Sequence, residues 1–511
     1  MTHVLPQAVG KVYLVGAGPG DPGLITWRGV ECLRRADAIL YDYLVNPRIL
    51  AHAKPGAELV CLGRHGRDRI IPQTEINERM IGLARQGRTV VRLKGGDPTI
   101  FARLADELDA LSAAGIPFEI IPGLSAALAA GSYAGICVTH RDEASAVAFV
   151  TGHEQEGKEA AGLDFAALAM FPGTLVFYMG VITARQWSAA LIAAGKPADI
   201  PAAIIHRCSW PDQQVITTTL GQVAAELEAA RLRPPAIVVI GEVTAPAAVH
   251  DWFSTRPLFG QRVLITRTAE QAEVLEGRLS ELGGACLLQP AIEIGPPEHW
   301  APVDAALSRL DEFHWLVFSS ANGVRFLLDR LLACGADLRR LAGIQIAVIG
   351  PGTAEELARY HLKADLQPDE YRAESLAAAL AGEARGQRFL LARASRGREV
   401  LAEELIAAGG IVEQVVVYSS RDIEQPDDEI AAALSAGQID WITVTSSAIA
   451  RSLVRMFGDN LRKSKLASIS PLTSEALRQL GHEPAVEARE YTIDGLVQAI
   501  LDAAGDSKSQ N

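Results

Sequence analysis

Short apolar runs alternate with segments of helical spacing along the whole chain. The runs at 11–15 and 236–241 have the continuous apolar character of buried strands, whereas Trp27, Val30 and Leu33 recur at the spacing of a helix face. Alternation of buried strands with amphipathic helices is typical of α/β domains with parallel sheets. The pattern therefore predicts an α/β fold throughout.

The chain is too long for one ordinary core. Its 511 residues exceed the usual size of a single domain. The stretch 245–260, with two prolines and three aromatic residues, separates the run at 236–241 from another strand-like run at 262–267. We therefore expect, in chain order, a tail, a first domain, a linker, a second domain and a polar tail at residues 1–10, 11–245, 246–260, 261–503 and 504–511.

The second half contains an internal duplication. Residues 261–267 resemble residues 387–393, an offset of 126, and the same offset relates 315–320 to 441–446. Each repeat has the pattern of a strand, a short polar turn and an amphipathic helix. Because open α/β sheets bind ligands at the strand ends, two similar lobes predict a cleft lined by these turns.

Composition restricts the class of protein. Hydrophobic residues make up 49% of the chain and charged residues 21%, which fits a globular protein and argues against disorder. The net charge of −13, without a long lysine or arginine run, makes nucleic acid and anionic membranes poor partners. The sequence shows no signal-peptide pattern and no apolar stretch of membrane-spanning length, so we expect a cytoplasmic enzyme.

The cysteines form no Cys-X-X-Cys pair, and most lie in apolar runs. This pattern predicts buried free thiols, with neither a disulfide framework nor a metal site. The six cysteines are Cys32, Cys61, Cys137, Cys208, Cys286 and Cys334.

Three turns of the first half carry glycine directly after a strand-like run. They lie at 16–23, 94–98 and 122–126, and the helix after the second is expected to direct Phe101 and Leu104 inward. The first turn is not the dinucleotide fingerprint, since an aspartate occupies the third glycine position. Two glycines followed by a carboxylate suit a neutral or cationic ligand with hydroxyl groups better than a polyphosphate. The turns form one shared pocket or are three unrelated turns.

The first half resembles the uroporphyrinogen-III C-methyltransferases of the class III methyltransferase fold, over nearly all of residues 11–245. That resemblance implies transfer of two methyl groups from S-adenosylmethionine to uroporphyrinogen III, giving precorrin-2 and S-adenosylhomocysteine, without a metal. It also implies a homodimer. The segments that carry it are 15–22, 41–45, 91–98, 122–127, 139–142, 149–153, 178–180 and 235–241.

The resemblance also implies roles for single residues. Asp42 matches the proposed general base; the alternative is a strand-end aspartate bound to backbone amides. Arg64 occupies the position of a lysine proposed as proton donor, and it suits a carboxylate clamp better, with His65 as a titrating neighbour and Arg141 as a further substrate contact. The residues implied to bind the cofactor are Pro19, Gly95, Gly96, Asp97, Ile100, Ser125, Ala126, Met179 and Cys208.

The duplicated half resembles uroporphyrinogen-III synthase across roughly residues 260–503. This resemblance implies a bilobed fold in which the first strand unit returns to the C-terminal lobe, and cyclisation of hydroxymethylbilane with inversion of its last ring. Tyr418 matches a tyrosine proposed to assist departure of the substrate hydroxyl; an ordinary strand-end aromatic is the alternative. The expected substrate contacts are Ser320, Asn322, Arg393, Ser446 and Thr473.

Together these features favour a fusion enzyme that performs consecutive steps toward sirohaem or cobalamin. One alternative is a methyltransferase for a later corrin precursor or a ribosomal RNA. Another is a C-terminal half that only binds tetrapyrroles and has no catalytic activity. The acidic charge weighs against RNA.

Overall fold

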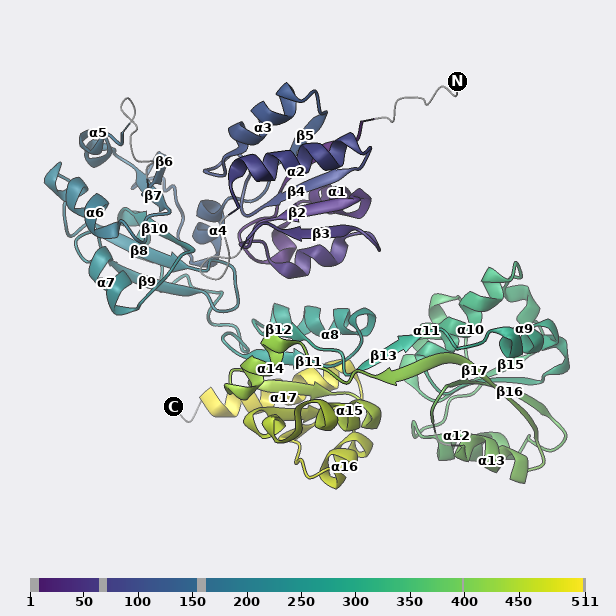
Figure 1. Ribbon diagram of the computed structural model, residues 1–511. Helices are drawn as coiled ribbons and strands as arrows, with labels where there is room; N and C mark the ends of the chain where they lie inside the picture. The colour runs from purple at the N-terminus through teal and green to yellow at the C-terminus, as the bar shows by residue number, and fades with distance from the viewer. Residues whose placement is uncertain (1–8, 64–70, 154–161, 398, 509–511) are drawn as a thin grey trace, which may run out of the picture. The chain divides into compact units, whose positions relative to one another are not determined.

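The computed structural model describes residues 9–63, 71–153, 162–397 and 399–508. The chain divides into two compact units, Met1–Gly260 and Gln261–Asn511. Each unit contains two five-stranded sheets (Figure 1). Within the described residues, no helix has the length and apolar character needed to cross a membrane.

The first sheet of the first unit is parallel throughout, with strand order β3-β2-β4-β1-β5. All its carboxyl ends therefore lie at one edge, where the glycine turns follow β1, β4 and β5. Separate apolar clusters fill its two faces. Its strands are β1 (Val12–Gly16), β2 (Ala38–Tyr41), β3 (Glu58–Cys61), β4 (Val90–Lys94) and β5 (Phe118–Ile121), and its helices are α1 (Trp27–Arg35), α2 (Gln73–Arg85) and α3 (Leu104–Ala113).

The second sheet is mixed, with order β6-β7-β10-β8-β9 and only the β6–β7 pair parallel. Helix α4 (Ala126–Tyr133) connects the two sheets along the chain. The other elements are β6 (Val147–Thr151), β7 (Thr174–Tyr178), β8 (Pro201–His206), β9 (Gln214–Thr219), β10 (Ala236–Ile240), α5 (Phe165–Met170), α6 (Ala184–Ala193) and α7 (Val223–Ala229).

The segment 246–260, which the sequence predicts as a linker, packs on the first unit. Phe253 is 1% exposed, and its ring lies 4.7 Å from that of Tyr133. The Trp252 Nε1 donates to the Ser132 carbonyl at 2.8 Å, and Leu258 is fully buried. Phe253, with Phe259 packed beside it, therefore extends the core of the first unit.

The second unit confirms the duplication at the level of strand register. Ile265 pairs with Thr443, and the residues at the repeat-related positions, Leu391 and Val317, pair in the same way. Because β11 pairs with β18, the first strand joins the C-terminal lobe. Strands β13 and β17 lead between the lobes (Figure 1).

The two sheets of this unit have the orders β12-β11-β18-β19-β20 and β13-β17-β16-β14-β15. The strands are β11 (Arg262–Ile265), β12 (Ala285–Leu288), β13 (Ile292–Gly295), β14 (Trp315–Phe318), β15 (Gln345–Val348), β16 (Arg388–Ala394), β17 (Ile411–Asp422), β18 (Trp441–Val444), β19 (Lys465–Ser468) and β20 (Val486–Glu487). The helices are α8 (Ala269–Glu281), α9 (Ala301–Ser308), α10 (Ala321–Ala333), α11 (Pro351–Arg359), α12 (Ala373–Ala381), α13 (Val400–Ala407), α14 (Asp428–Ser435), α15 (Ser447–Phe457), α16 (Pro471–Gln479) and α17 (Ile493–Lys508). Helix α17 thus extends into the segment expected as a polar tail.

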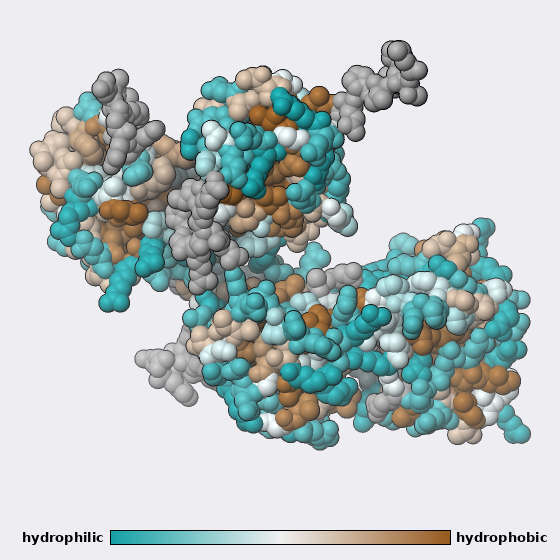
Figure 2. Space-filling view, in the orientation of Figure 1, coloured by the Kyte–Doolittle hydropathy of each residue, from teal (hydrophilic) through white to brown (hydrophobic). Residues whose placement is uncertain are grey.

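Two expectations about burial are wrong in part. All six cysteines are free, but Cys61, Cys137 and Cys334 are exposed, since they lie outside the cores that their apolar neighbours fill. Phe101 is 41% exposed instead of inward, because it precedes α3 in a left-handed turn (φ 51°). Hydrophilic residues dominate the visible surface, with separate hydrophobic patches between them (Figure 2).

Candidate functional site

Three glycine turns of the first unit meet at the carboxyl edge of its parallel sheet. The backbones of Gly18 and Gly96 exchange hydrogen bonds of 3.2 and 2.8 Å. A Cβ atom on Gly16 or Gly123 would lie 2.7 or 2.3 Å from the Gly96 carbonyl oxygen, so only glycine permits this approach. The turns that the sequence singles out are therefore neighbours in space.

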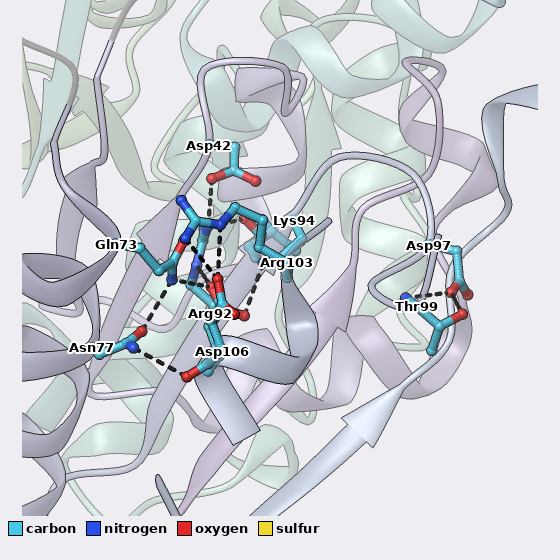
Figure 3. Close-up of polar contacts among 11 residues, drawn as sticks. Asp42, Gln73, Asn77, Arg92, Lys94, Asp97, Thr99, Arg103 and Asp106 are labelled. Carbon is cyan, nitrogen blue, oxygen red and sulfur yellow. Dashed lines mark hydrogen bonds and ion pairs between the residues drawn. The ribbon is translucent and has the colours of Figure 1, made fainter. Parts of the chain in front are cut away.

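Asp97 connects two of these turns. Its Oδ1 accepts from the Thr99 amide at 2.7 Å and from the Thr99 hydroxyl (Figure 3). Its Oδ2 accepts from the Gly123 amide at 3.0 Å. The carboxylate is thereby fixed in orientation and remains half-buried. Ile100 closes the same turn, since its amide donates to the Asp97 carbonyl at 3.3 Å.

A tyrosine joins the second sheet to this region. Tyr178 ends β7, and its hydroxyl lies 2.6 Å from the Ser125 hydroxyl and accepts from the Ala127 amide at 3.0 Å. Burial raises the pKa of Tyr178. Met179 follows with φ 53° and is 49% exposed. Tyr178 thus contacts Ser125 through its hydroxyl and precedes Met179 in the chain.

Two other cofactor candidates lie near the first turn and after β8. Pro19 is half-buried in the first turn, beside Gly20, where a Cβ would clash with the Trp210 ring at 2.2 Å. Ser209 accepts from the Asp21 amide at 3.0 Å, which ties the loop after β8 to this turn. Cys208 is buried, and burial raises the pKa of its thiol to about 12. The thiol is therefore uncharged at neutral pH.

Asp42 follows β2 at the same edge and carries an ion pair. Its Oδ1 accepts from the Arg92 guanidinium at 2.6 Å, and its backbone amide donates to the Leu93 carbonyl at 3.2 Å. Among the described residues, Arg92 therefore binds the carboxylate, and not the backbone amides of the alternative interpretation. The Asp42 side chain keeps 30% exposure, so one side of the carboxylate stays accessible.

Behind Asp42 lies a buried charge network that sequence reasoning missed. The Glu107 carboxylate, fully buried, binds Arg92 Nε at 3.0 Å and Lys94 Nζ at 2.8 Å (Figure 3). Gln73 donates to the same carboxylate at 3.3 Å. Desolvation lowers the pKa of Lys94. The sequence feature that could have predicted this network is the presence of Arg92 and Lys94 in an otherwise apolar strand, followed by Glu107 on the next helix.

The remaining candidates of the first unit are two residues of the segment 64–70 and Arg141. Arg64 and His65 lie outside the described residues. Arg141 is exposed in the loop between α4 and β6.

In the second unit, one group of candidates comes together around Tyr418. Its hydroxyl lies 3.0 Å from the Ser320 hydroxyl, and burial raises its pKa. Ser320 also caps α10 by accepting from the Gly323 amide at 3.0 Å. Asn322 Oδ1 accepts a hydrogen bond from Gln271 Nε2 at 3.2 Å. Gln271 is a site residue that the sequence did not suggest.

The side chains of the other candidates of this unit form hydrogen bonds or ion pairs with other residues of the same unit. Arg393 pairs with Glu399 and donates to Gln414 at 2.9 Å. Ser446 caps α15, since its hydroxyl accepts from the Ile449 amide at 3.2 Å. The Thr473 hydroxyl is 3.1 Å from that of Ser470, which caps α16.

Comparison with known proteins assigns both units. Residues 11–224 match the family of Tetrapyrrole (Corrin/Porphyrin) Methylases, and residues 273–498 match Uroporphyrinogen-III synthase HemD. The Porphyrin biosynthesis protein HemD of Ruminiclostridium josui is 33% identical over 500 residues, 97% of this chain and 98% of that protein. The chain belongs to these two families.

Other relatives cover smaller parts. The Uroporphyrinogen-III C-methyltransferase of Bacillus subtilis (strain 168) is 36% identical over 70% of this chain and 74% of its own length. The Siroheme synthase of Sodalis glossinidius (strain morsitans) is 46% identical over 50% of this chain and 54% of its own. The protein is thus an enzyme that fuses a uroporphyrinogen-III C-methyltransferase, here called the methyltransferase unit, to a uroporphyrinogen-III synthase, the synthase unit.

Within the methyltransferase unit, the glycine turns, Asp97 and Asp42 share one sheet edge, while Tyr178 reaches it from the second sheet. In the synthase unit, Ser320, Asn322 and Tyr418 form one polar group at the carboxyl end of β14 and β16. Ser446 and Thr473 lie at the corresponding end of the other sheet.

Proposed function

We propose that the synthase unit converts hydroxymethylbilane to uroporphyrinogen III, and that the methyltransferase unit methylates this product twice to give precorrin-2. The observation that carries the proposal is the shared sheet edge at which Asp42, held by Arg92, lies with the converging glycine turns. A held carboxylate beside backbone-accessible turns suits proton removal next to a bound donor.

The residues present fit S-adenosylmethionine as methyl donor. Gly96 has φ 71°, and a Cβ atom there would meet nothing within 4 Å, so its backbone borders open space. The uncharged Cys208 thiol and the anionic Asp97 create no repulsion toward a cationic sulfonium. Asp97 and the backbone at Gly95 and Gly96 would hold the donor's hydroxyl and ammonium groups.

S-adenosylmethionine supplies an activated methyl group, which a pyrrole carbon of the substrate accepts as the carbon–sulfur bond breaks. The accessible side of Asp42 accepts the proton that the pyrrole system then loses. Arg92 fixes the orientation of this carboxylate through its 2.6 Å contact, and Glu107 fixes Arg92 from the buried side. The chain thus contributes alignment and a proton acceptor.

The synthase step needs departure of the substrate hydroxyl and ring closure in a folded geometry. Tyr418, 3.0 Å from Ser320, can donate a hydrogen bond to the leaving hydroxyl because burial keeps its phenol protonated. Hydroxyl and amide groups at Ser320 and Asn322 bind carboxylates without introducing a base that would attack the cationic intermediate.

Anaerobic incubation of the whole chain with hydroxymethylbilane and S-adenosylmethionine tests the proposal, with products separated by mass and isomer type. Dimethylated type III product is the expected result. Type III product without added methyl groups would contradict the methylation step. Type I product alone would contradict the synthase step, and supplied uroporphyrinogen III would then test methylation separately.

A further inference from the structure

The two repeats of the synthase unit each place an arginine at the same position. Arg267 follows β11, and Arg393 lies at the end of β16, the strand related to β11 by the duplication. The matching register of β11 with β18 and of β16 with β14 makes the two positions structurally equivalent. Equivalent arginines would be expected to have equivalent partners.

Their surroundings differ. Arg393 has an ion pair with Glu399 and a hydrogen bond to Gln414. Arg267 has no ion pair among the described residues, its Nε is buried without a hydrogen-bond partner, and its one contact is a 3.5 Å bond from Nη2 to Gln271. Burial lowers the pKa of the Arg267 guanidinium.

Arg267 is half-buried, and its buried Nε is costly because this donor has lost its water without gaining an acceptor. Folded proteins satisfy nearly all such groups, so an exception indicates a partner that binds there. A guanidinium cannot release its proton at physiological pH and so remains a cation in need of an anion.

A chain of side-chain contacts connects Arg267 to the polar group around Tyr418. Gln271, which Arg267 contacts, donates in turn to Asn322 at 3.2 Å. On the other side, the neighbouring Thr266 hydroxyl donates to the Thr443 carbonyl at 2.5 Å, near the end of β18. Arg267 therefore follows a strand that is bound to β18, and its side chain contacts Gln271, which binds Asn322 beside Tyr418.

We propose that Arg267 binds a carboxylate of the polycarboxylate ligand of the synthase unit, as a bidentate guanidinium–carboxylate pair. This inference rests on the proposed synthase function, which supplies a substrate with acetate and propionate side chains. The ligand provides the anion that Glu399 provides to the arginine of the other repeat. The asymmetry of the two repeats thereby gives the ligand one orientation.

The test compares wild type, Arg267→Gln and Arg267→Lys in the full chain, with Arg478→Gln as control, since exposed Arg478 is already paired with Glu483 in the same lobe. We measure KM and kcat for type III product without S-adenosylmethionine, binding of uroporphyrin III by calorimetry, and thermal unfolding. Because the methyltransferase unit is unaltered, a difference in uroporphyrin binding reports on the synthase unit.

Arg267→Gln is expected to raise KM and weaken uroporphyrin binding by about 10- to 100-fold, the effect of a charge-assisted hydrogen bond. Arg267→Lys should recover part of the loss, and the unfolding temperature of neither variant should fall, because neither change breaks an ion pair among the described residues. Unchanged KM and binding, or a lowered unfolding temperature without a binding loss, would overturn the inference. If wild type forms no type III product but binds uroporphyrin through Arg267, the proposed cyclisation fails and this inference stands.

Discussion

The two units treat charge at their candidate sites in opposite ways. The methyltransferase unit buries a network in which Glu107, fully buried, neutralises Arg92 and Lys94, and Arg92 reaches out to Asp42. Around Tyr418, the synthase unit gathers hydroxyl and amide groups. The difference follows the chemistry: a methylated carbon must lose a proton to a fixed base, whereas cyclisation through a cation requires shape and hydrogen bonds.

Removing the charge of Asp42 should give the largest effect. Asp42→Asn keeps an oxygen for Arg92 but has no basic carboxylate, so methylation should slow by about 10²- to 10⁴-fold. Single-turnover methylation of uroporphyrinogen III measures this rate, and type III synthesis should be unaffected. Asp106→Asn is the control, because the exposed Asp106 carboxylate pairs with exposed Arg103, while Asn77 binds only the Asp106 backbone carbonyl (Figure 3). Near-normal turnover of Asp42→Asn would remove the general-base assignment.

Glu107→Gln should affect stability first. The change leaves Arg92 and Lys94 buried with one anion fewer, and breaking a buried ion pair costs about 3–5 kcal/mol. Urea unfolding of the full chain should show the methyltransferase transition at lower denaturant, while the synthase transition stays in place. Glu31→Gln, which removes an exposed partner of Arg28, should have a much smaller effect. Equal shifts of the urea midpoint of the methyltransferase transition for both variants would show that the buried charge network does not stabilise this unit.

The sequence allowed more of the fold than of the candidate sites to be predicted. Strand-like runs and the 126-residue offset describe backbone patterns, and the pairing of Ile265 with Thr443 and of Leu391 with Val317 confirms the repeat. Partners of single side chains depend on distant segments. Arg393 looked available in the sequence, but Glu399 and Gln414 bind it in the structure.

Contacts between distant segments account for the remaining differences. Glu107 lies on the helix face where apolar residues were expected, because two cations on β4 require an anion inside. Phe101 precedes the helix and packs its ring 5.1 Å from that of Tyr178, a residue of the other sheet. No local pattern specifies such a contact.

Asp97→Ala should strongly weaken donor binding without affecting the synthase unit. The change removes the acceptor that fixes Thr99 and Gly123, together with the carboxylate expected to bind the donor, and each charge-assisted hydrogen bond is worth about 10- to 100-fold in affinity. Calorimetry with S-adenosylmethionine measures the loss, and Asp97→Asn, which keeps one acceptor oxygen, should fall between. Unchanged affinity of Asp97→Ala would exclude Asp97 from the donor site.

The smallest effect is expected at Tyr418, and it tests the neutral character of the hydroxyl and amide group around this residue. Tyr418→Phe removes one hydroxyl from the pair with Ser320 and keeps the ring, which stacks on Phe326. One neutral hydrogen bond corresponds to about a tenfold change, so the rate of type III formation should fall by about that factor while methylation is unchanged. Tyr360→Phe is the matched control, since the Tyr360 hydroxyl binds Asp329 on the surface of the same unit. A loss as large as that of Asp42→Asn would mean that Tyr418 transfers a proton in the rate-limiting step. The contrast between the charged network around Asp42 and the neutral group around Tyr418 would then fail.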